Sequence, residues 1–183
     1  MRTLPHYEFR GTPVDVIPYG PSEDSSRTVT FDNDHVLDVT GFAEAAERPV
    51  LATLPGGSRV AVASLESQSI LKILAWRDRG DHTHRKDALD LETILAAASS
   101  GIYRERLWRD DALERYAFDI DLAGAHRLGC EAAATLGPVA HSSVLAVVGD
   151  EERDSLARAM NGLLSRERLN AYLEGVVTGG PVH

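Results

Sequence analysis

A strongly apolar helical segment, residues 64–98, limits the folds open to this chain of 183 residues. Between Ile70 and Trp76 apolar side chains fall on nearly every face of the expected helix, with Lys72 as the exception. A helix that is apolar all round has to be buried among other elements. A second helix is expected from about Arg85 to Ala98, after a short polar loop. We therefore expect this two-helix segment to organise the packing of the rest of the chain.

The residues before this segment have strand patterns. Alternating apolar and polar residues, interrupted by Gly and Pro, predict one hairpin around residues 7–18 and another around 49–64. Short strands are expected between them at Thr28–Phe31 and His35–Val39. After residue 98, helical patterns occur at 105–116, 122–136, 150–164 and 167–177, with a break expected at 135–141. The predicted class is α+β, with a strand-rich part (1–63) and a helical region (64–183) that together form one compact unit.

The composition excludes several classes of protein. Apolar residues make up 43% and charged residues 26% of the chain, and no apolar run approaches the ~20 residues of a membrane span. The first residues contain no apolar signal core, which predicts a cytoplasmic protein without a membrane partner. The only cysteine is Cys130, so no internal disulfide and no cysteine-based zinc site is expected. The net charge of −9 argues against a broad electrostatic grip on nucleic acid.

The placement of lysine is unusual. Of 19 basic residues only Lys72 and Lys86 are lysine, and both lie in the two-helix segment. Chance is one explanation, and a specific need for a compact ammonium group is the other. Lys72 could extend its charge past its own stem to the surface, or it could meet a phosphate group.

Three acidic residues allow both a structural and a functional interpretation. Asp87 and Asp90 suit the start of a helix, where the macrodipole favours carboxylates, but one of them could also lie beside Lys72. Asp15 lies within a strand, where acids are uncommon. It could occupy a half-exposed sheet face, or it could bind a metal ion at the edge of a cleft.

The pair Asp119 and Asp121, in the sequence FDIDLAG, is open to a similar choice. In two-metal enzymes two such acids on a strand bind both ions. Here the pair precedes a helical pattern, so capping of the helix N-terminus is the better explanation.

Three blocks in order carry a resemblance: VDVIPYG, HVLDVTGFAEA and VASLESQSILKILAWRDRGDHTHRKDALDLETIL. Together they resemble a group of predicted bacterial nucleotidyltransferases, which are similar to the abortive-infection type nucleotidyltransferase toxins of toxin–antitoxin systems. The later LAGAHRLGCEAA and the C-terminal helices also look like that group, so the resemblance spans about residues 7–178. It implies a partial nucleotidyltransferase-like mixed sheet with helices packed on one side and a helical C-terminal region.

The resemblance also implies a reaction, the transfer of a nucleotidyl group from a nucleoside triphosphate to a hydroxyl acceptor such as RNA. Two Mg²⁺ ions held by three carboxylates would neutralise the developing charge. Asp15 matches the third of these carboxylates and is the implied metal ligand. Lys72 matches a lysine near the triphosphate, Asp87 matches the acid that opens the next helix, and Arg85 is assigned with Lys72 to nucleotide binding.

The sequence departs from the group at one place. In the group, the first two carboxylates belong to an Asp-x-Asp motif that follows a Gly-Ser turn and precedes the position of Asp15. The 14 residues before Asp15 in this chain contain no such motif. We therefore expect a poor catalyst unless the missing half is supplied, by a longer gene product or by another chain. An uncovered sheet edge or apolar face is expected as well, which predicts a protein partner or self-association. The alternative function is a catalytically inactive binding or interaction module of the same fold, for example a toxin–antitoxin component.

Overall fold

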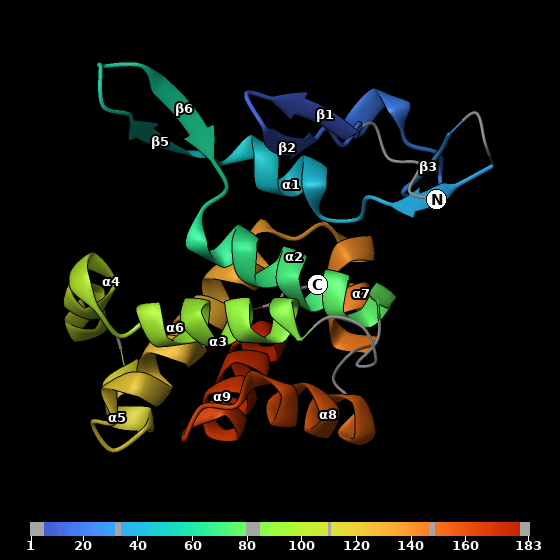
Figure 1. The fold of residues 1–183 in the computed structure, drawn as a ribbon. Helices are drawn as coiled ribbons and strands as arrows, with labels where there is room; N and C mark the ends of the chain where they lie inside the picture. The colour runs from blue at the N-terminus through green and yellow to red at the C-terminus, as the bar shows by residue number, and fades with distance from the viewer. Residues whose placement is uncertain (1–5, 32–33, 80–84, 110, 147–148, 180–183) are drawn as a thin grey trace.

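A computed structural model describes residues 6–31, 34–79, 85–109, 111–146 and 149–179. Within these residues the strands come first and most of the helices follow, so the α+β class is confirmed (Figure 1). The strands are β1 (His6–Phe9), β2 (Thr12–Asp15), β3 (Thr28–Thr30), β4 (Val36–Asp38), β5 (Val50–Thr53) and β6 (Arg59–Val62). The α-helices are α1 (Phe42–Glu47), α2 (Leu65–Arg79), α3 (Lys86–Ala97), α4 (Gly101–Arg106), α5 (Ala112–Arg115), α6 (Ile120–Thr135), α7 (Pro138–Ala146), α8 (Asp150–Met160) and α9 (Ser165–Thr178).

The described strands form three separate antiparallel hairpins, β1–β2, β3–β4 and β5–β6, where one mixed sheet was expected. Each hairpin pairs strands that follow one another in the sequence, and no ladder of hydrogen bonds joins one hairpin to the next in the described residues. Figure 1 shows α2 and the later helices on one side of the hairpins, while α1 lies beside the hairpins themselves. The expectation of a mixed sheet was wrong, because each described strand pairs only with the strand next to it in the sequence.

Two of the hairpin turns follow directly from the sequence. Arg10 and Gly11 both have positive φ and connect β1 to β2 in two residues, which suits the right-handed twist of the strands. Gly56 and Gly57, with φ of 99° and 86°, turn the chain between β5 and β6. Glycine adopts such angles without steric cost, so the predicted hairpin at 49–64 is confirmed.

The core lies among the helices. α2 is buried on most sides, as its composition required, and Ile70, Ile73 and Leu74 belong to one large apolar cluster with α3, α6, α8 and α9. Tyr172 of α9 is fully buried, and its hydroxyl shares a 2.9 Å hydrogen bond with Ser69 of α2. None of the helices in the described ranges combines the length and the apolar character that crossing a bilayer requires.

Helices α6 and α9 approach each other closely because glycines lie at their contact. A Cβ atom on Gly129 would collide with the backbone carbonyl oxygen of Tyr172, and one on Gly175 would collide with that of His126. The two backbones are therefore nearer to each other than side chains at these positions would permit.

Two helical regions differ from expectation. The helix expected at 105–116 is divided into α4, a short 3-10 turn (Leu107–Arg109) and α5, because Leu107 and Leu113 turn inward to pack against Ala123 of α6. The expected break at 135–141 contains the start of α7. Proline is tolerated in the first turn of a helix, where its missing N–H needs no partner, so Pro138 begins a helix there.

The acidic pair before α6 caps that helix. Asp119 is the N-cap residue, and its carboxylate accepts hydrogen bonds from the backbone N–H groups of Asp121 and Leu122 at 2.9 and 3.1 Å. The capping interpretation of Asp119 is therefore confirmed. Asp121 has a different partner, because its carboxylate accepts hydrogen bonds from Arg168 of α9 and Ser99.

Candidate functional site

Lys72 lies between two carboxylates where α2 packs against α3. Its ammonium nitrogen is 3.0 Å from an oxygen of Asp87 and 2.6 Å from an oxygen of Asp90. We call these three residues the lysine cluster. The expectation that a carboxylate of the KDALDL helix lies beside Lys72 is confirmed, and both acids contribute.

The three members of the lysine cluster differ in exposure. The Asp87 side chain is 2% exposed, Lys72 is 29% exposed and Asp90 is 39% exposed. Asp87 is buried because it occupies the first turn of α3 on the same side as Leu91, which belongs to the core. The ammonium therefore has one buried partner and one partner that solvent reaches.

Opposing effects act on the charge of Lys72. Partial burial lowers the pKa of its ammonium group, but the hydrogen bonds to Asp90 and Asp87 and the charges of both acids outweigh burial. The net result is a pKa above the usual value for lysine. Lys72 is thus a fixed cation at neutral pH, which suits the binding of an anion and does not suit a role as a general base.

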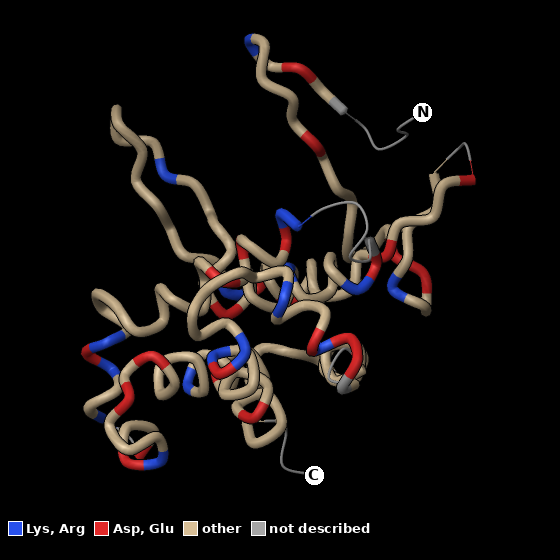
Figure 2. Tube along the Cα trace, turned by 60° about the horizontal axis from the view of Figure 1, so that its bottom comes forward, with Lys and Arg blue, Asp and Glu red and all other residues tan. Residues whose placement is uncertain are grey.

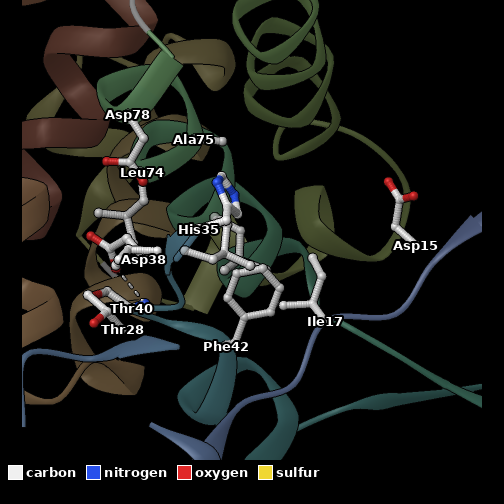
Figure 3. A pocket seen from close by; sticks show the side chains of 13 residues that line it. Asp15, Ile17, Thr28, His35, Asp38, Thr40, Phe42, Leu74, Ala75 and Asp78 are labelled. Atoms are coloured by element: carbon white, nitrogen blue, oxygen red, sulfur yellow. Dashed lines mark hydrogen bonds between the residues drawn. The ribbon is translucent and has the colours of Figure 1, made fainter. Parts of the chain in front are cut away.

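Asp15 lies in another place, at a cavity between the β1–β4 region and α2. The cavity has a volume of about 540 Å³. Apolar side chains from both parts line it together with three carboxylates and a histidine: Ile17, Val36, Leu37, Phe42, Leu71, Leu74, Ala75, Asp15, Asp38, Asp78 and His35. In Figure 3 Asp15 stands at one side of the cavity, apart from Asp38 and Asp78.

The lysine cluster and the cavity use adjacent faces of α2. Leu71, Leu74 and Asp78 face the cavity, while Lys72, the residue after Leu71, is turned by about 100° toward α3. Neither Lys72 nor Asp87 is among the described residues that line the cavity. The structure therefore brings Lys72 and Asp87 together and places Asp15 at a neighbouring site, so a role shared by all three stays a prediction.

Arg85, the residue predicted to help bind the nucleotide, immediately precedes α3. Its side chain is exposed and donates a 3.3 Å hydrogen bond to the backbone carbonyl of Ala159 in α8. It thus contacts α8 on the outside of the helical region, and its nucleotide contact stays a prediction.

The carboxylates at the cavity do not assemble the three-acid site that two Mg²⁺ ions would need. Arg77 donates hydrogen bonds to Asp38 at 2.6 Å and to Asp78 at 2.8 Å, so a guanidinium already neutralises two of the three. Among the described residues no three His, Cys, Asp or Glu side chains are placed to hold one metal ion. The residues present therefore do not fit the implied metal pair.

Two features of this region have no signal in the sequence. Asp38 and His35 flank the cavity because the β3–β4 hairpin lies across it from α2, an arrangement that no local pattern reveals. Arg168 of α9 contacts Glu92 of α3 at 2.7 Å and Asp121 at 2.9 Å, which joins three helices through one guanidinium. The spacing of these residues, 76 and 47 positions apart, leaves no periodic pattern.

Comparison of the chain with protein-family models, with curated proteins and with solved structures gave no match. Neither the fold nor the site is therefore assigned to a family by similarity. The geometry around Lys72 is therefore the basis for a functional proposal. Figure 2 shows how the basic and acidic residues of the chain are distributed along the trace.

Proposed function

We propose that this chain is a nucleotidyltransferase-type protein that binds a nucleoside triphosphate at Lys72. The observation that carries the proposal is the lysine cluster, which holds an ammonium group at an edge that solvent reaches. A compact ammonium is a good partner for a phosphate oxygen. In the proposed reaction, which requires the missing half of the module to be supplied, the hydroxyl of an acceptor attacks the α-phosphorus of the triphosphate. The acceptor takes the nucleotidyl group and pyrophosphate leaves, with RNA as the candidate acceptor.

The two acids of the lysine cluster have different roles in this proposal. Asp87 is buried and keeps the ammonium in place in the presence and absence of ligand. Asp90 is the more exposed acid, so a phosphate can replace it at the ammonium while the carboxylate moves into water at small cost. Displacement of Asp87 would instead separate a buried carboxylate from the ammonium, which is expensive. Asp15 remains a candidate for a substrate contact on the adjacent face of α2.

The test combines nucleotide binding with nucleotide incorporation. Calorimetry measures ATP, GTP, CTP and UTP binding, and labelled triphosphates with Mg²⁺ and RNA report transfer. We compare the wild type with Lys72→Met, which keeps most of the apolar stem, and with Lys86→Met as the matched control. Lys86 is exposed at the start of α3 and is the only other lysine of the chain.

We expect the wild type and Lys86→Met to bind alike and Lys72→Met to bind at least about tenfold more weakly, as for loss of one charge-assisted contact. Binding that is equal in all three proteins would contradict the role of Lys72. Binding by none of them would contradict the nucleotide proposal as a whole.

A second candidate is the non-catalytic interaction module. It is favoured by the apolar side chains that hairpins β1–β2 and β5–β6 leave exposed, since such surfaces mark contacts with other proteins. If the wild type neither binds nor transfers nucleotides but does associate with a protein, this second function replaces the first.

A further inference from the structure

Two hairpins of this protein each present an apolar face that is largely exposed, although Arg10 lies over the ring of Phe9 and Ala52 is half-buried. In β1–β2, cross-strand pairing places Tyr7 opposite Val14 and Phe9 opposite Thr12, so these side chains share a face. In β5–β6, Val50 pairs with Val62 and Ala52 with Val60, which makes the second face entirely aliphatic. We call the following residues the hairpin faces: Tyr7, Phe9, Val14, Val50, Ala52, Val60 and Val62.

The exposure of the hairpin faces is large for side chains of this type. Phe9 is 66% exposed, Tyr7 59% and Val50 52%. Both hairpins extend from the same side of the helical region, as Figures 1 and 2 agree. A two-stranded hairpin is marginally stable in water by itself, and its outer edges leave backbone N–H and C=O groups unpaired. A covering surface would bury the apolar faces and stabilise both hairpins.

The exposed area is sufficient for a stable dimer. Full exposure of an aromatic side chain corresponds to about 150–250 Å², so Phe9 and Tyr7 together leave roughly 200–300 Å² of apolar surface in water. The exposed side chains of Val14, Val50, Val60 and Val62 add a comparable apolar area. A standard interface takes about 800 Å² from each partner, of which roughly 60% is non-polar. The hairpin faces alone therefore provide the apolar part of one side of such an interface.

The hairpin faces are the part of the surface where the charge of the chain least opposes a second copy. Each chain carries a net charge of −9, so two copies repel each other over most of their surface. In β5–β6 with its turn, residues 50–62, Arg59 is the only charged side chain. In β1–β2 the cross-strand pairing places Glu8 and Asp15 on the opposite face from Tyr7 and Phe9, while the guanidinium of Arg10 in the turn lies over the Phe9 ring. Figure 2 shows β5–β6 as an arm with a single basic segment. Two copies can thus meet through the hairpin faces away from the acidic groups that repel them, whereas a basic partner would be drawn to the acidic remainder of the surface.

We propose that two copies of this chain associate through the hairpin faces of β1–β2 and β5–β6. An uncharged aliphatic face is complementary to its own copy, which is the requirement for a contact across a two-fold axis. The proposal is independent of nucleotide binding, since the lysine cluster lies between α2 and α3.

The test is the mass of the purified full chain in solution, measured by sedimentation across the micromolar range. Val60→Lys and Phe9→Lys each place an ammonium group on a hairpin face, twice per dimer. Val177→Lys is the matched control, because Val177 is 58% exposed on α9, away from the hairpins. Circular dichroism verifies that each variant keeps its helical content.

We expect the wild type and Val177→Lys to be dimers and each hairpin variant to dissociate at least about tenfold more readily, as for a central interface position. A wild type that is monomeric at every concentration overturns the proposal, and a different protein would then be the occupant of the hairpin faces. A dimer that both hairpin variants retain overturns it equally, because the contact would lie on another surface.

Discussion

Replacement of Lys72 by methionine tests the structural half of the interpretation of the lysine cluster. The substitution keeps most of the apolar stem in contact with α2 and α3 but removes the ammonium group. Asp87, which is 2% exposed, then loses the cation that faces it, and the carboxylate of Asp90 is left on the same side of α3. We expect Lys72→Met to reduce the free energy of unfolding.

The size of the loss follows from burial. Removal of one partner from a fully buried ion pair costs about 3–5 kcal/mol. Here Lys72 and Asp90 are partly exposed, and water can screen the remaining carboxylates, so we expect about 2–3 kcal/mol. For a chain of this length that corresponds to a decrease in Tm of roughly 5–10 °C.

The assay is urea unfolding at neutral pH of the wild type, Lys72→Met, Asp87→Asn, the double variant and the control Lys86→Met. Asp87→Asn combined with Lys72→Met should cost less than the sum of the single changes, because the double variant removes the buried negative charge together with the ammonium. Lys86→Met should lie within about 0.5 kcal/mol of the wild type. If Lys72→Met is as stable as Lys86→Met, Asp87 does not depend on Lys72 and the reasoning is refuted.

Two further predictions concern the helical region. Gly175→Ala should destabilise the protein by about 2–4 kcal/mol in thermal or urea unfolding, since the new Cβ meets the carbonyl oxygen of His126. Gly149→Ala meets nothing within 4 Å and changes only the N-cap of α8, so it should cost no more than about 1 kcal/mol. Equal effects of the two substitutions would contradict the close packing of α6 and α9. For Asp121, burial raises the pKa, but hydrogen bonds from Ser99 and Arg168 outweigh burial and keep its pKa below the usual value. The contribution of ionised Asp121 to the free energy of unfolding is therefore fully present above about pH 4 and is lost as the pH falls through the lowered pKa. Urea unfolding of the wild type and Asp121→Asn from pH 7 to pH 2 measures this contribution. The stability difference between the two proteins should shrink only on the acid side.

Local features of the structure could be predicted from the sequence because their causes lie within a few residues. The turn at Gly56 and Gly57 requires positive φ, and the cap at Asp119 needs only the N–H groups of the next two or three residues. The apolar pattern of residues 70–76 required burial, and α2 is buried. The one site contact that was predicted, Lys72 with an acid of the next helix, joins residues only 15 positions apart.

The remaining features depend on tertiary structure. Separate hairpins formed in place of a mixed sheet because hydrogen bonds between distant strands depend on how the chain packs, which strand periodicity does not encode. Asp15 is predicted to share one site with Lys72, but the rotation of about 100° between successive helical residues sends Leu71 toward the cavity of Asp15 and Lys72 toward Asp87. The sequence by itself thus determined which elements form and which side chains carry charge. Only the packing of α2 between the hairpins and α3 decided which of those charges meet, because ion pairs across elements depend on distances that no local pattern specifies.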